Sequence, residues 1–285
     1  MGLNLGICGV GSLASLFAAK LASLGSDSPV RVHMIGNWED QIQHINQHGL
    51  SLISATDSIK DIRVSALHWQ DCPQLDIAIV LNKSYQTEAT AKYLANRMSK
   101  SGLVITLQNG LGNTDVLKSY IDCKVLSGLT SEAANRPRLG AVVHAGTGKT
   151  IIESSMHPLM ATLLNILVRA GFDVESSSRI ENEIWNKLLI NIAINPLTAI
   201  FDIKNGQLLE DDVLISVACD AAVEVAAVAN KLGLPIADIE STIKSVCRNT
   251  AENHSSMLQD IKSGRETEID SLCGAVVRYG EKLDV

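Results

Sequence analysis

The sequence predicts an α/β protein in which a doubly wound parallel sheet is followed by an all-helical second half. Short apolar strand candidates alternate with helical segments through the first half of the chain. A glycine-rich turn joins the first strand to the first helix. Beyond about residue 158 the apolar periodicity becomes helical. A chain of 285 residues is long enough to form two cores, so we expect two domains.

The first elements form a strand, helix, strand unit. Residues 3–8 are predicted as a buried strand, residues 12–24 as a helix and residues 30–35 as a second strand. This order within about 35 residues is typical of a parallel sheet with a right-handed crossover. Further strands are expected at 77–81, 103–107 and 125–129, and helices at 87–98 and 114–120.

The remaining elements place the domain boundary. Residues 141–153 are polar at alternate positions, which favours antiparallel strand added at a sheet edge. One more strand is expected at 172–175, and helices are expected at 158–170, 180–200, 208–232, 236–248 and 267–283. We place the boundary near residue 178, which gives domains of residues 1–178 and 179–285.

Composition narrows the class of ligand. The net charge is −7 without a compensating basic block, which disfavours nucleic acid or an anionic membrane and favours a small molecule. The six cysteines are widely spaced, so we predict no metal site and no disulfide framework, and reduced cysteines in the cytoplasm. Glycines interrupt the N-terminal apolar run, so we predict no signal peptide. No stretch reaches about 20 purely apolar residues, so we predict no membrane span.

The glycine-rich turn has the G-x-G-x-x-G/A pattern of a phosphate loop. The pattern comprises Gly9, Val10, Gly11, Ser12, Leu13 and Ala14. Gly9 allows the tight turn, and Gly11 lets a pyrophosphate approach the backbone amides at the helix N-terminus. The alternative is a purely structural turn, but the strand before it and the helix after it favour a Rossmann-type dinucleotide-binding domain.

The end of the second strand normally distinguishes NAD from NADP. A carboxylate there binds the ribose 2′-hydroxyl, whereas a basic residue binds a 2′-phosphate. Residues 36–39 (Gly-Asn-Trp-Glu) place neither directly at the strand end, and Arg31 lies at the strand's start. The residues themselves therefore leave the choice open.

A polar stripe crosses an otherwise apolar helix. Lys187, Asn191 and Asn195 recur every four residues and so share one helix face. The stripe is either a solvent-exposed face or the binding site of a ligand with carboxylate, carbonyl and hydroxyl groups. Asparagine is a poor helix former, which favours the ligand hypothesis.

Two further polar residues, Ser256 and Glu268, are compatible with purely structural roles. Ser256 is well placed to cap a helix N-terminus, and Glu268 is compatible with an exposed carboxylate in the first turn of the following helix. The pattern by itself favours these structural roles.

Five segments, in order along the chain, resemble the ketopantoate reductase family. They are residues 81–87 (LNKSYQT), 107–112 (LQNGLG), 185–188 (WNKL), 191–199 (NIAINPLTA) and 255–260 (SSMLQD) with 265–270 (RETEID). The resemblance implies NADPH-dependent reduction of 2-dehydropantoate to (R)-pantoate, a step toward pantothenate and coenzyme A. The alternatives are a reductase of another branched 2-keto acid and a non-catalytic dinucleotide-binding protein of this fold.

The resemblance also implies residue roles. Lys187 would be the general acid, supported by Glu268. The substrate contacts would be Asn109, Asn191, Asn195, Asn205 and Ser256, and the cofactor contacts outside the glycine turn would be Lys83, Asn109, Ala134 and Glu268. Asn205 precedes Gly206 and is also a turn candidate, and Lys83 is also compatible with a solvated loop.

Two expectations concern the second half of the chain. The chain ends at Val285, about where the family's members continue into a final helix, so a shortened substrate domain is expected. All-helical second domains attached to a dinucleotide domain often associate, which favours a homodimer.

Overall fold

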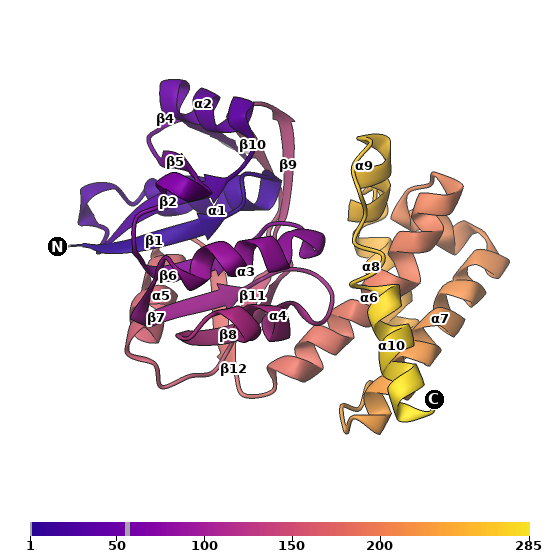
Figure 1. Cartoon of the computed structure of the whole chain (residues 1–285). Coiled ribbons are helices and arrows are strands. Elements are labelled where there is room, and N and C mark those ends of the chain that lie inside the picture. The colour runs from indigo at the N-terminus through magenta and orange to yellow at the C-terminus, as the bar shows by residue number, and fades with distance from the viewer. Residues whose placement is uncertain (1, 55–57) are drawn as a thin grey trace. The chain divides into compact units, whose positions relative to one another are not determined.

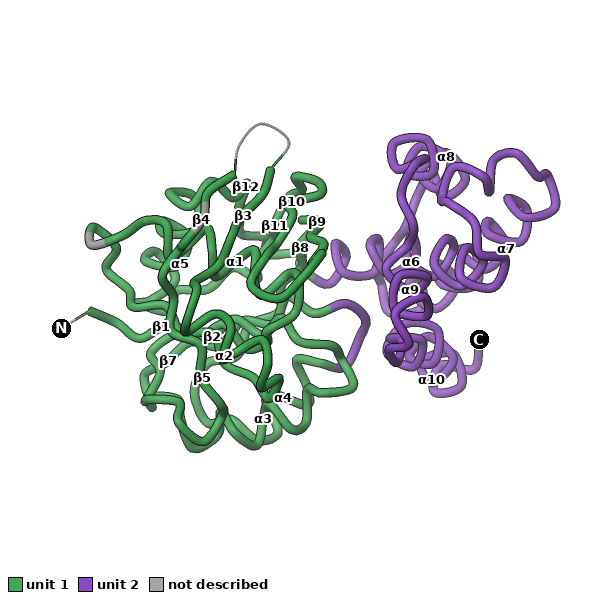
Figure 2. Tube along the Cα trace, turned by 90° about the horizontal axis from the view of Figure 1, so that it is seen from above, with its two compact units in different colours: residues 1–108, 113–180 green, residues 109–112, 181–285 purple. Residues whose placement is uncertain are grey.

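The computed structural model describes residues 2–54 and 58–285, without the side chains of Ser26 and Lys60. The chain divides into two compact units (Figure 2). The first comprises residues 1–108 and 113–180, and the second comprises residues 109–112 and 181–285. The short segment 109–112 therefore belongs to the second unit although its sequence neighbours belong to the first.

The first unit is built on an eight-stranded sheet (Figure 1). Its strands are β1 (Leu3–Cys8), β2 (Val30–Gly36), β5 (Ser65–His68), β6 (Leu75–Val80), β7 (Met98–Thr106), β8 (Lys124–Thr130), β11 (Lys149–Glu153) and β12 (Asp173–Ser177). They are ordered β12-β11-β8-β7-β6-β1-β2-β5. All neighbours are parallel except β8 and β11. The predicted doubly wound fold is confirmed.

Helices cover both faces of this sheet. The helices of the unit are α1 (Ser12–Ala22), α2 (Glu39–His48), α3 (Thr87–Ala95), α4 (Asn113–Tyr120) and α5 (Pro158–Arg169), with short 3₁₀ turns η1 (Gly25–Asp27), η2 (Trp69–Asp71) and η3 (Ser84–Gln86). In β6, Ile77 and Ile79 pack into the core that contains α1 and α5, whereas Ala78 and Val80 pack into the core that contains α3 and α4. The strands are apolar on both faces because each face is covered.

A second sheet corrects one expectation of the sequence analysis. Residues 141–153 are not one antiparallel addition but two strands in different sheets. β10 (Ala141–Gly146) joins a four-stranded sheet of order β4-β3-β10-β9, with β3 (Leu50–Ile53), β4 (Ser58–Ile62) and β9 (Ala133–Arg138). Only β11 joins the main sheet, where it pairs antiparallel with β8, and β12 pairs parallel with β11 at the edge of that sheet. Short strands of this kind are weakly marked in a sequence, because their apolar alternation spans few residues.

The second unit is helical and has its own core. Its helices are α6 (Ile180–Phe201), α7 (Asp212–Lys231), α8 (Ile239–Asn249), α9 (Ser256–Lys262) and α10 (Cys273–Leu283), with the 3₁₀ segment η4 (Asn205–Glu210). The helix predicted at 208–232 is interrupted, because Asp211 accepts hydrogen bonds from the amides of Val213 and Leu214 and so caps α7. The helix predicted at 267–283 begins only at Cys273, so Glu268 precedes it in a turn.

Helix α6 is long and apolar enough to cross a membrane by length and composition alone. This differs from the sequence expectation, which found no such stretch because polar residues interrupt the apolar ones. In the structure, Trp185, Leu188 and Leu189 of α6 are buried in the core of the second unit. A core helix meets the same criteria as a membrane span.

Candidate functional site

The phosphate loop lies at the point where the strand order reverses. The chain runs from β1 outward through β2 and then returns to the other side of β1 as β6. Ligands of doubly wound sheets bind beyond the carboxyl ends of the strands at such a point. Gly9 follows β1 with φ of +132°, and a Cβ built there would lie 3.2 Å from the amide nitrogen of Asn82, two residues after β6. The two strand ends thus meet at Gly9.

The N-terminus of α1 fits an anionic ligand. Gly11 is the N-cap residue and has no side chain with which to cap the first amides of the helix. A Cβ built on Gly11 would meet no atom within 4 Å, so the backbone is open on that side. Val10 and Ala14 are buried in the core, while Ser12 and Leu13 are half-buried at the helix start. Uncapped amides beside an exposed glycine are what a pyrophosphate requires.

The other predicted cofactor residues of the first unit lie on separate elements. Lys83 is half-buried and is the N-cap residue of η3, three residues after β6. Ala134 lies on β9 and packs against the core that contains α1. Both belong to the same unit as the loop.

A buried polar network joins the ends of β6 and β7, and the sequence analysis did not find it. The side-chain amide of Gln108 donates to the Asn82 carbonyl oxygen at 3.0 Å and to Thr87 Oγ1 at 2.9 Å. Thr106 Oγ1 donates to Gln108 Oε1 at 2.9 Å, and Thr87 Oγ1 also bonds to Asn113 Oδ1 at 2.8 Å. Satisfied buried networks of this kind rigidify the backbone that carries them.

In the second unit the structure brings Lys187, Asn109 and Glu268 together. Lys187 Nζ of α6 donates to Asn109 Oδ1 at 2.8 Å. Asn109 Nδ2 lies 3.5 Å from Glu268 Oε2, at the limit of hydrogen bonding. The Glu268 side chain is buried, so it is not the exposed first-turn carboxylate that the pattern allowed. The Asn109 amide therefore connects an ammonium to a carboxylate.

Burial changes the acidity of Lys187. Desolvation lowers the pKa of its ammonium from 10.5 to about 8, and the negative charge of Glu268 opposes this shift. A lysine of this kind is charged at neutral pH and also releases its proton readily. These are the properties of a general acid that works near neutral pH.

The segment that carries Asn109 is fixed against the turn that carries Glu268. The Leu111 amide donates to the Ser271 carbonyl oxygen at 2.9 Å, and the Ser271 amide donates to the Glu268 carbonyl oxygen at 3.1 Å. Gly110 has φ of +82°, and a Cβ there would overlap the Ser271 carbonyl oxygen and lie 2.6 Å from its Oγ. Only glycine permits this close approach.

The C-terminal residue of the polar stripe on α6, Asn195, faces α9. Asn195 is buried, and its Nδ2 lies 3.5 Å from Ser256 Oγ. The capping role belongs to Ser255 and not to Ser256, because Ser255 Oγ accepts from the Leu258 amide at 3.2 Å. Thr198 Oγ1 lies 2.8 Å from Ser255 Oγ and anchors this cap to α6. Thr198 follows Asn195 by three residues, so helical periodicity could have identified it.

Asn191 and Asn205 complete the predicted set. Asn191 is half-buried one turn after Lys187, on the same helix face. Asn205 begins η4 and is buried; its Nδ2 donates to Thr250 Oγ1 at 3.0 Å. In the described part of the chain, its Oδ1 is buried without a hydrogen-bond partner. An unpaired buried acceptor normally indicates a missing donor, such as a water or a ligand hydroxyl.

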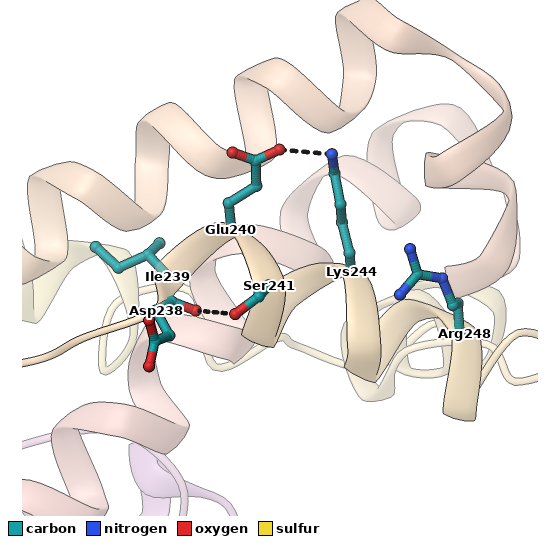
Figure 3. Close-up of a pocket in the computed structure, with 6 residues that line it drawn as sticks. All are labelled: Asp238, Ile239, Glu240, Ser241, Lys244 and Arg248. Carbon is teal, nitrogen blue, oxygen red and sulfur yellow. Dashed lines mark hydrogen bonds and ion pairs between the residues drawn. The ribbon is translucent and has the colours of Figure 1, made fainter.

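A surface hollow along α8 is separate from these residues. It has a volume of about 510 Å³ and is lined by Asp238, Ile239, Glu240, Ser241, Lys244 and Arg248 (Figure 3). Glu240 and Lys244 form an ion pair one helical turn apart, and Ser241 Oγ donates to the Asp238 carbonyl oxygen. The hollow contains none of the predicted site residues. Within residues 2–54 and 58–285, no cluster of His, Cys, Asp and Glu is suited to a metal ion.

An open phosphate loop at a strand-order reversal and a buried ammonium beside a carboxylate are features of a dinucleotide-dependent oxidoreductase. The chain belongs to the ketopantoate reductase family. The family described as "Ketopantoate reductase PanE/ApbA" matches residues 5–156, and its C-terminal counterpart matches residues 179–285. The two matches span both compact units.

Known proteins resemble the chain over nearly its whole length. A 2-dehydropantoate 2-reductase of Archaeoglobus fulgidus is 34% identical, with 98% of this chain and 91% of that protein aligned. The crystal structure of a ketopantoate reductase from Ralstonia eutropha JMP134 is 30% identical, has a TM-score of 0.91 and covers 99% of this chain and 93% of its own. D-Mandelate dehydrogenase with NADH and anilino(oxo)acetate shares the fold, at 24% identity and TM-score 0.91, with 99% and 93% of the two chains covered.

Proposed function

We propose that this protein reduces 2-dehydropantoate to (R)-pantoate, with Lys187 as the general acid. The observation that carries the proposal is the bond from the Lys187 ammonium to Asn109, beside the buried carboxylate of Glu268. The activity is that of relatives that align along nearly the entire chain. A bound nicotinamide dinucleotide would supply the hydride for the ketone carbon.

The residues of the chain would manage the proton. As the ketone carbon accepts hydride, its oxygen gains negative charge, and the Lys187 ammonium stabilises that charge and transfers one proton to the oxygen. The alcohol forms, the lysine becomes neutral, and solvent returns its proton. Glu268 favours the charged lysine and so prepares the donor for the next turnover. Asn109 orients the ammonium through its side-chain oxygen.

We assign substrate binding to the side-chain amides and the hydroxyl of the predicted substrate residues of the second unit. Asn191 and Asn195 share the helix face of Lys187, and Ser256 Oγ lies near Asn195. The buried Oδ1 of Asn205 would accept a hydrogen bond from a substrate hydroxyl and so gain the donor it lacks in the described structure. Asn109 would lie beside both ligands. On this proposal the second domain, from residue 179, holds the keto acid, and the first, residues 1–178, holds the dinucleotide.

The assay that tests the proposal follows absorbance at 340 nm with purified protein and 2-dehydropantoate, with NADPH and NADH in parallel. A branched 2-keto acid without the 4-hydroxyl group is the comparison substrate. We expect rapid oxidation only with 2-dehydropantoate. Preference for the comparison substrate would instead support a reductase of another keto acid, and tight cofactor binding without oxidation would support a non-catalytic protein.

We further infer that NADPH is the preferred cofactor. The phosphate loop and Lys83 accommodate either dinucleotide, so the preference depends on the residues around the ribose 2′ position. The family resemblance favours the phosphorylated form. The ratio of kcat/KM for NADPH to that for NADH measures the preference, and a ratio below one would contradict it.

We also infer a cytoplasmic homodimer. The second unit exposes apolar side chains at the end of α6 and along α7, including Ile200 at 74%, Phe201 at 52% and Val213 at 70% exposure. Large exposed apolar side chains often lie in an interface when they gather on one surface. Light scattering during size-exclusion chromatography should give twice the chain mass of 30.5 kDa, whereas a mass of one chain would contradict the dimer.

Glu268→Gln should shift the pH dependence of the reaction. The carboxylate raises the pKa of Lys187, so its removal should lower that pKa below about 8. We expect the alkaline limb of the kcat/KM profile for 2-dehydropantoate to move to lower pH. The matched control is Glu266→Gln, since Glu266 is exposed two residues away. An unchanged limb in Glu268→Gln, or an equal shift in the control, would contradict the electrostatic role.

A further inference from the structure

The basic residue that was absent from the end of the second strand is supplied by another strand of the first unit. The Arg136 guanidinium of β9 lies over the Trp38 ring, with its central carbon 3.9 Å from the ring centroid. Trp38 follows β2 by two residues and is the N-cap residue of α2. The cation thus lies where a Rossmann-type unit holds the ribose 2′ group.

The end of β2 and the face of β9 both adjoin the phosphate loop. A Cβ built on Gly36, the last residue of β2, would lie 3.0 Å from Val10 of the loop. Helix α1, which begins at the loop, packs against β9. Arg136 lies on β9 two residues after Ala134, which the family resemblance assigns to the cofactor.

Two other charged residues flank the end of β2 in the sequence, Glu39 and Arg31. The Glu39 carboxylate is bound to His68 Nε2 at 2.6 Å and to Gln43 Nε2 at 2.5 Å. Each of its oxygens thus already accepts one hydrogen bond within the first unit. Arg31 lies five residues before the end of β2, about 17 Å away along an extended strand.

We propose that Arg136, held by Trp38, binds the 2′-phosphate of NADPH and thereby determines the cofactor preference. This inference rests on the proposed reductase function. The planar guanidinium suits bidentate binding of a phosphate, and stacking on an indole fixes its plane. Arg136 and Trp38 are 98 residues apart in the sequence, so only the fold combines them into one site.

Binding measured by calorimetry tests the proposal without turnover. The probes are NADP⁺ and NAD⁺, together with the fragments 2′,5′-ADP and 5′-AMP. In Arg136→Ala we expect affinity for NADP⁺ and 2′,5′-ADP to fall about 10- to 100-fold, the value of hydrogen bonds to a charged group. Affinity for NAD⁺ and 5′-AMP should change less than about threefold, since these ligands lack the 2′-phosphate.

Three variants act as controls. Arg138→Ala removes an exposed arginine of the same strand and should leave all four affinities unchanged. Arg136→Lys keeps the charge without the planar fork and should lose part of the discrimination. Trp38→Phe keeps an aromatic ring under the guanidinium, so this variant should retain most of the discrimination between phosphorylated and unphosphorylated ligands.

Two outcomes would overturn the proposal. One is an equal loss of affinity for the phosphorylated and unphosphorylated ligands in Arg136→Ala, which would indicate an adenine or structural contact. The other is no change in any affinity. Turnover of 2-dehydropantoate with saturating NADH separates this question from the proposed function. If the wild-type protein does not reduce the keto acid but Arg136→Ala loses affinity for 2′,5′-ADP, the proposed function is refuted and the phosphate site is supported. The reverse result would leave the function intact and refute the site.

Discussion

Replacing Lys187 with alanine should lower kcat by roughly 10²-fold or more while cofactor affinity changes little. General acid catalysis contributes on the order of 10²- to 10⁴-fold, and the alanine variant has no group that can donate the proton. Steady-state kinetics with 2-dehydropantoate, together with calorimetric titration of the cofactor, measures both quantities. Lys244→Ala removes a half-buried lysine of α8 that is ion-paired with Glu240, and it serves as the control. Near-normal turnover in Lys187→Ala would refute the assignment.

The pH dependence provides an independent test of the same residue. Because the pKa of Lys187 is lowered to about 8, kcat/KM for the reduction should be constant at neutral pH and fall about tenfold per unit above pH 8. The alkaline limb should disappear from the residual activity of Lys187→Ala. If the variant keeps the wild-type limb, another group titrates.

Lys187 should also lower the stability of the folded protein. Its folded pKa of about 8 lies below the ordinary value of 10.5, so the folded state is penalised below about pH 8 and the penalty fades as the pH rises to 10.5. Lys187→Met removes the buried charge and retains most of the volume. We expect its melting temperature at pH 7 to equal or exceed that of wild type although turnover is lost. Loss of activity therefore need not reflect unfolding.

Gly110→Ala should reduce both stability and turnover, whereas Gly112→Ala should affect stability only slightly. Both glycines have positive φ, of +82° and +86°, so alanine at either position has a similar backbone cost of about 1 kcal/mol. They differ in their surroundings. A Cβ at Gly110 would overlap the Ser271 carbonyl oxygen, and a Cβ at Gly112 would meet no atom within 4 Å.

The overlap should displace Asn109 from Lys187. We expect Gly110→Ala to lose about 2–4 kcal/mol of stability, and a shift of about 1 Å in the site costs on the order of 10² in kcat. Urea denaturation and kcat, measured on both variants, test this expectation. Equal effects of the two substitutions would show that the contact with Ser271 does not position Asn109.

The sequence contained enough information for the doubly wound class of the first unit. Strands β1, β2, β6, β7 and β8 are short apolar runs separated by helices, and this pattern depends only on which residues must be buried on both faces of a sheet. The glycine turn after β1 was identifiable because its function requires glycine at fixed spacing. The four-stranded second sheet was missed, since strands of four to six residues have little periodicity.

The sequence pattern also identified some of the candidate site residues. Lys187, Asn191 and Asn195 form a stripe that helical geometry alone predicts. The roles of Asn109, Glu268 and Asn205 came only from family resemblance, because each lies in a turn or loop without periodic pattern. For Glu268 the pattern favoured an exposed carboxylate, and the structure shows that its side chain is buried.

By itself, the sequence determined the doubly wound fold, the phosphate loop and the polar face of α6, because these follow from spacing within one element. Only the tertiary structure decided that Asn109 bridges Lys187 and Glu268, that Ser255 caps α9, and that Arg136 stacks on Trp38. These contacts join residues far apart in the chain or depend on one hydrogen bond. Their geometry is set by the packing of whole elements, which no local pattern of residues encodes.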